Sequence, residues 1–180
     1  MAAGATIYHL QIDLSDVDRG VYEQLDLRVA QHPSESMPYL LTRVLAYCLC
    51  YQEGIAFGRG VSTTEEPALW VKDATGVRLW VEVGSPSVER LHRASKASGQ
   101  LVVFTQHDPR LLQKAVAGKK IHRAEEIVIH SLEPAFLGAL EESLGRTTKW
   151  VVVHTEGQLF VTVGDRNFSS AVGRHSLLAD

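Results

Sequence analysis

The stretch 69–84, LWVKDATGVRLWVEVG, decides the fold of this chain. It predicts two strands, 69–73 and 77–83, joined by the loop Ala74-Thr75-Gly76, because a glycine suits the left-handed position of a three-residue hairpin loop. That loop places Asp73 opposite Val77 and Trp70 opposite Trp80. In the second strand one face is apolar and the other is polar, and the polar face consists of Arg78, Trp80 and Glu82.

The carboxylates around this hairpin are its most informative side chains. If the pairing continues through Pro67, Glu66 faces Gly84 and becomes a diagonal neighbour of Glu82, roughly 7–8 Å away at the backbone. Two such carboxylates are able to share one divalent cation. Asp73 is excluded, because it lies on the opposite face and about 16 Å along the strand, and it is interpreted as a turn residue. The alternative is that these acids are solvated hairpin charges.

Helical and strand periodicities extend the pattern on both sides. A helix follows HPSES, with Ser34 or Ser36 as its N-cap and Glu35 near the positive end of its dipole. A short strand in GIAF, the hairpin, a helix over about 87–98 and a strand at 101–105 come next. The predicted order is therefore helix, three strands, helix, strand.

The outer segments add strands and helices to this centre. Residues 4–14 and 20–30 alternate as a hairpin around SDVDRG. Beyond 105 we predict helices around 108–117 and 133–143, a strand EEIVIHSL, and a closing strand pair, KWVVVHT and QLFVTVG. Since no repeat or linker is visible, 180 residues indicate a single α/β domain over 1–180.

Charge is unevenly distributed along the chain. Between Arg90 and Arg123 eight cations stand against the single acid Asp108, a balance of +7. Because the whole chain carries −3, the remainder carries about −10. Such a basic segment is able to follow a phosphate backbone, provided that its residues share one surface. The alternative is a set of solvated helix faces.

Other classes of protein are excluded or disfavoured by composition. No apolar run approaches the ~18–20 residues of a membrane helix, and the start of the chain has no signal-peptide pattern. Two cysteines, Cys48 and Cys50, are poorly placed to pair with each other, so a reduced cytoplasmic setting is expected. Walker A, HExxH, paired CxxC and G-x-S-x-G motifs are absent from the sequence.

Several unusual pieces recur in the order typical of one family. They are ATIY at 5–8, HPSE at 32–35, Arg43, the RG of FGRG, EEP at 65–67, LWVEVGSP at 79–86, the Arg90 helix and VVFT at 102–105. On these pieces the chain resembles the YaeQ family over most of its length. The resemblance implies a PD-(D/E)XK nuclease-like fold with a mixed sheet. The core order of that fold, αβββαβ, matches the order predicted above.

The resemblance also implies roles for particular residues. Glu35 corresponds to the acid of the first helix and Glu82 to the acid of the (D/E)-x-K strand. The superfamily lysine is replaced by Gly84, so that Lys96, Arg93 or Arg90 would substitute for it. Ala68 stands where relatives carry an acid, which would leave Glu66 to serve in its place.

Two functions follow from this resemblance and the basic segment. The first is a Mg²⁺-dependent nuclease, with Mn²⁺ as a substitute ion, whose ligands are Glu82, Glu66 and Glu35 and whose catalytic residues are Glu82, Glu35, Lys96 and Arg93. The second is a scaffold without catalysis that binds a protein partner or nucleic acid, either DNA or RNA. In both, the expected nucleic-acid contacts are Arg90, Arg93, Lys96, Arg110 and Lys114. A purely structural or regulatory partner-binding protein is a third possibility, supported only by the acidity of the remaining chain.

Overall fold

The computed structural model describes residues 4–59, 63 and 65–180. Gly60, part of the RG piece named above, lies outside the described residues. In chain order the elements are β1 Thr6–Asp16, β2 Val21–Gln31, α1 Met37–Leu49, β3 Ile55–Phe57, β4 Leu69–Asp73, β5 Gly76–Val83, α2 Val88–Ala97, β6 Ser98–Thr105, α3 Pro109–Val116, the 3₁₀ turn Ala124–Glu126, β7 Val128–Ser131, α4 Pro134–Glu142, β8 Thr147–Thr155, β9 Gln158–Val163, β10 Arg166–Ala171 and β11 Gly173–Ser176.

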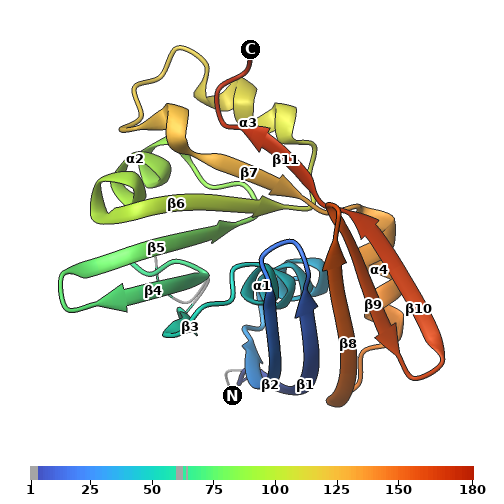
Figure 1. The fold of residues 1–180 in the computed structure, drawn as a ribbon. Coiled ribbons are helices and arrows are strands. Elements are labelled where there is room, and N and C mark those ends of the chain that lie inside the picture. The colour runs from blue at the N-terminus through green and yellow to red at the C-terminus, as the bar shows by residue number, and fades with distance from the viewer. Residues whose placement is uncertain (1–3, 60–62, 64) are drawn as a thin grey trace.

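The strands form two mixed sheets (Figure 1). Sheet A has the order β10-β9-β8-β1-β2, in which β1 and β8 are parallel. Sheet B has the order β11-β7-β6-β5-β4-β3, in which β5, β6 and β7 are parallel. The carboxyl ends of these three parallel strands therefore meet at one edge of sheet B, the kind of edge where ligands bind in many α/β proteins.

Two apolar clusters surround sheet B. The larger one joins sheet A, α1 and α4 to one face of sheet B, where Leu79, Val81 and Val83 of β5 point. The smaller one covers the other face with α2 and α3, and it includes Trp80, Leu91 and Leu112. The predicted two faces of β5 are thus confirmed, and Glu82 lies on the face that α2 and α3 cover.

The first helix forms where the sequence predicts it, and Ser36 is its N-cap. The Ser36 hydroxyl accepts a hydrogen bond from the Tyr39 amide at 3.3 Å, and Pro38 lies in the first turn. Glu35 consequently stands just outside the helix. Leu40 and Val44 are fully buried, and Arg43, between them in sequence, is also buried. No helix in the described ranges is long and apolar enough to cross a membrane.

The predicted hairpin exists, but its loop was predicted wrongly. Asp73 pairs with Gly76, so the loop has two residues, and an irregularity at Val71/Lys72 shifts the register. This β-bulge leaves Arg78 without a partner in β4 and returns Trp70 to its place opposite Trp80. Asp73 is indeed a turn residue, because its Oδ1 accepts hydrogen bonds from the amide and hydroxyl of Thr75.

Elsewhere the local predictions hold with three differences. The two strands of the N-terminal hairpin have the predicted length but lie one or two residues further along the chain. Glu125 and Glu126 belong to a 3₁₀ turn rather than to the start of β7. No strands were predicted where β10 and β11 form. The strand β11 belongs to sheet B, where it pairs with β7.

Candidate functional site

Glu82 is the buried acid at the carboxyl end of β5. Its Oε1 accepts two hydrogen bonds, one from Trp80 Nε1 at 2.6 Å and one from Arg90 Nε at 2.8 Å. Only 5% of its side chain is exposed. Burial raises the pKa of the Glu82 carboxyl above its ordinary value, although Trp80, Arg90 and the charge of Arg93 act in the opposite direction.

Arg90 joins Glu82 to the segment that precedes β4. Its Nη2 donates to the main-chain oxygen of Glu66 at 2.8 Å, while its Nε binds Glu82. The guanidinium therefore holds one carboxylate oxygen and one carbonyl oxygen from two different parts of the chain. The Arg90 backbone is fixed as well, because its amide donates to Ser87, the N-cap of α2, at 3.1 Å.

The Glu66 carboxylate does not pair across the hairpin as predicted. Glu66 lies in a bend before Pro67, and β4 begins only at Leu69. The reason is that β4 is an interior strand, where a proline has no N–H to offer. Instead, Glu66 Oε2 accepts hydrogen bonds from the amide of Arg59 at 2.8 Å and from its Nε at 3.1 Å. These bonds lower the pKa of the Glu66 carboxyl.

Glu35 forms a second buried ion pair, with Arg43. The distance from Arg43 Nη2 to Glu35 Oε1 is 2.8 Å, and 4% and 1% of the two side chains are exposed. The same Nη2 donates to the carbonyl of Ala30 at the end of β2, at 2.8 Å. Burial raises the pKa of the Glu35 carboxyl, and the nearby charge of Arg43 opposes that rise.

The charges of both buried acids act on Tyr39. Its pKa is raised by burial and also by the charges of Glu82 and Glu35, so both carboxylates are within electrostatic reach of its hydroxyl. The Tyr39 ring also closes the space beside Gly84, since a Cβ there would lie 3.4 Å from Cε2. Gly84 has φ +93°, which L side chains rarely adopt. A lysine at position 84 would be strained, so glycine suits the backbone at this position.

The predicted cations separate into different places. Arg93 is exposed and its charge acts on Glu82. Lys96 lies at the other end of α2, beside Asp73 and Thr75 of the β4–β5 turn. That turn precedes Glu82 by six residues of β5, about 20 Å at the rise of a strand. The structure therefore brings Arg90 and Arg93 to Glu82 and does not bring Lys96 there.

The helices that carry the basic segment lie in one layer. Helices α2 and α3 and the turn after them cover the same face of sheet B (Figure 1). Arg110 in this layer pairs with Asp108, and Arg123 with Glu126. Within the described part of the chain, this layer has two exposed acids that make no ion pair, Glu89 and Glu125. It has five exposed cations that make none, namely Arg93, Lys96, Lys114, Lys119 and Lys120.

The acids as folded do not suit a divalent metal. Within residues 4–59, 63 and 65–180, no group of three or more histidine, cysteine or acidic side chains is placed to hold a metal ion. Glu35, Glu66 and Glu82 each have one oxygen engaged by an arginine, and a cation beside a guanidinium is repelled. No described residue donates a hydrogen bond to their second oxygens.

Comparison with known proteins identifies the family. The YaeQ protein family model matches residues 1–172. The chain belongs to the YaeQ family. It is 34% identical to the protein YaeQ of Escherichia coli strain K12 over 106 residues, which span 58% of this chain and 59% of that protein.

Two solved structures of the YaeQ family have the same fold. The YaeQ protein of Pseudomonas syringae aligns over 94% of this chain and 95% of its own, with 32% identity and a TM-score of 0.84. The YaeQ protein of Xanthomonas axonopodis pv. citri aligns over 96% and 98%, with 28% identity and a TM-score of 0.87. This chain therefore shares its fold with both relatives.

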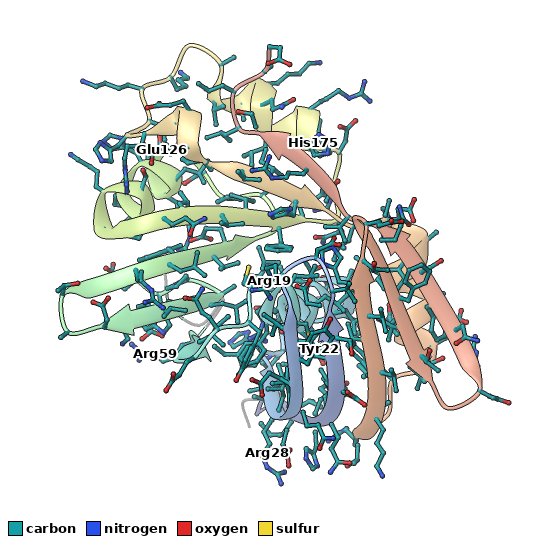
Figure 2. The ribbon with its side chains drawn as sticks, viewed as in Figure 1. Arg19, Tyr22, Arg28, Arg59, Glu126 and His175 are labelled. Atoms are coloured by element: carbon teal, nitrogen blue, oxygen red, sulfur yellow. The ribbon has the colours of Figure 1, made fainter. Side chains whose placement is uncertain are left out.

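Sequence reasoning missed the partners of the acids in this YaeQ family member. Arg43 was noted only as part of the resemblance, although a cation among buried positions of an apolar helix face is a signal of a buried acid. It also missed a charged cluster at the β1–β2 turn, where Arg19 lies (Figure 2). There the fully buried Asp16 binds Arg19 at 2.7 Å and His154 of β8 at 3.0 Å, so the cluster ties the hairpin to β8.

Proposed function

We propose that this YaeQ family member is a nucleic-acid-binding protein built on a PD-(D/E)XK nuclease-like core. The observation that carries the proposal is the layer of α2 and α3, which presents the five unpaired exposed cations on one face of sheet B. Unpaired cations on one surface are able to neutralise phosphates and release counterions, which is the main source of non-specific nucleic-acid affinity.

The order of elements supports the nuclease-like part of the proposal. The segment α1-β3-β4-β5-α2-β6 follows the αβββαβ order of that core, and β5 and β6 are parallel. Glu82 stands at the carboxyl end of β5 on the face that carries the cationic layer. The arginine beside each glutamate favours a binding role over metal-dependent cleavage.

Salt dependence tests this function. Five phosphate contacts give a slope of log K against log salt of about −4.5 on duplex DNA. The variant Lys114→Gln/Lys119→Gln/Lys120→Gln should make that slope less steep by about 2 to 3 and weaken binding alike on different sequences. Fluorescence anisotropy with labelled DNA and RNA of mixed sequence, from 50 to 200 mM salt, measures both.

A matched control removes the same number of cations from sheet A. Arg28, Arg146 and Lys149 are exposed, and Figure 2 shows Arg28 at the end of the hairpin remote from α3. The variant Arg28→Gln/Arg146→Gln/Lys149→Gln should leave the slope unchanged. Absence of binding by the wild type at 50 mM salt would refute the proposal, as would equal effects of the two triple variants.

Mg²⁺-dependent cleavage of nucleic acid is the second candidate, with Mn²⁺ as substitute. It is favoured by the place of Glu82 at the carboxyl end of the parallel strand β5. The ligands would be Glu82, Glu66 and Glu35, which are not grouped to hold an ion among the described residues and would have to come together. Bound Mg²⁺ would activate water and neutralise phosphate charge. Incubation of wild type and Glu82→Gln with labelled DNA and RNA tests it, and cleavage that persists in the variant would exclude this site.

A further inference from the structure

The guanidinium of Arg90 is surrounded by the kinds of oxygen that bind a metal. A carboxylate oxygen of Glu82 lies 2.8 Å from its Nε, and the main-chain oxygen of Glu66 lies 2.8 Å from its Nη2. Carboxylate and carbonyl oxygens are also the protein ligands that Mg²⁺ and Mn²⁺ prefer. The arginine thus satisfies, from α2, oxygen atoms of β5 and of the segment before β4.

The position of Arg90 in its helix is unfavourable without such a contact. Ser87 caps α2, so Arg90 lies in the first turn, where the helix dipole favours an acid such as Glu89 rather than a cation. Its side chain is only 21% exposed, and burial of a charge is costly unless the charge is paired. Glu82 therefore explains why a cation is found there.

We propose that Arg90 is a built-in cation, which neutralises Glu82 in place of a divalent metal and excludes the metal from this site. Arg90 is in this sense a positioning residue, since it fixes the Glu82 carboxylate and the Glu66 main chain together. Unlike a metal, a guanidinium stays charged at every accessible pH and does not dissociate. The inference concerns metal binding alone and does not rest on nucleic-acid binding.

Metal titration of three variants tests the proposal. Calorimetry with Mg²⁺ and with Mn²⁺ should give no site in the wild type and one site in Arg90→Met, where the two oxygens lose their cation. Arg90→Lys, which keeps the charge, should give no site. Arg90→Met/Glu82→Gln should also give none, because the carboxylate is absent.

Two results would overturn the inference. One is a metal site in the wild type that Glu82→Gln abolishes, and the other is a folded Arg90→Met variant that binds no metal. If Arg90→Met does not fold, the double variant decides. If the unpaired Glu82 charge is what prevents folding, adding Glu82→Gln should restore folding. If the double variant also fails to fold, the result contradicts the Glu82–Arg90 pairing on which the inference depends.

Discussion

Replacing Arg43 with methionine tests how strongly the buried ion pair at the start of α1 contributes to the fold. The change leaves Glu35, with 1% of its side chain exposed, without its cation and removes the donor to the Ala30 carbonyl. Loss of one partner of a buried pair typically costs about 3–5 kcal/mol. For a chain of this size each kcal/mol lowers the melting midpoint by about 2–4 °C, so the midpoint should fall by roughly 6–20 °C.

Thermal melts followed by circular dichroism, together with urea titrations, measure this effect. The control is Arg110→Met, which breaks the Arg110–Asp108 pair at a site where 82% of the arginine side chain is exposed, and it should not move the midpoint. The double variant Glu35→Gln/Arg43→Met should recover most of the loss, because no unpaired charge remains. A loss below about 1 kcal/mol for Arg43→Met, or an equal loss in the double variant, would refute the reasoning.

Three further outcomes are expected. Because burial raises the pKa of Glu82, the folded state binds the Glu82 proton more tightly than the unfolded chain does. The free energy of unfolding should therefore fall as pH rises above the ordinary glutamate value of 4.5. Glu82→Gln should reduce that fall in urea titrations between pH 4.5 and 8. Gly58→Ala should lower the urea midpoint, since its Cβ would lie 2.0 Å from the carbonyl oxygen of Pro67 and the backbone must shift. Cys48, buried with a pKa raised to about 12, should react with a thiol reagent at pH 8 only when the protein is unfolded.

Local patterns were enough to predict most helices and strands. The Ser36 and Ser87 caps and the alternation in β5 act over a few residues, so the printed sequence contains the whole signal. The strand order of sheet B and the crossing of β11 to that sheet depend on contacts between distant segments. For that reason the mixed sheet was expected, whereas its division into two sheets was not.

The sequence singled out Glu35 and Glu82 but not their ion-pair partners. Glu35 and Glu82 were both found to be buried acids near one tyrosine, whereas their arginine partners depend on how α1 and α2 sit against the sheets. The position of Glu66 was predicted from an extended hairpin, and Pro67 ended that strand early. The β-bulge at Val71/Lys72 was also invisible to periodicity, because it compensates the shorter loop and preserves the Trp70–Trp80 pair.

The pairing of the acids has a consequence for a polyanionic partner. Outside residues 90–123 the chain carries about −10, so such a partner is repelled by most of the surface and attracted by the layer of α2 and α3. Glu82 lies under the same layer, and the charge of Arg93 acts on it. Because Glu82 is buried, salt screens this interaction less than it screens exposed charges. Paired with Arg90, Glu82 does not oppose an anion bound at Arg93. Without Arg90, the charge of Glu82 would counteract that of Arg93.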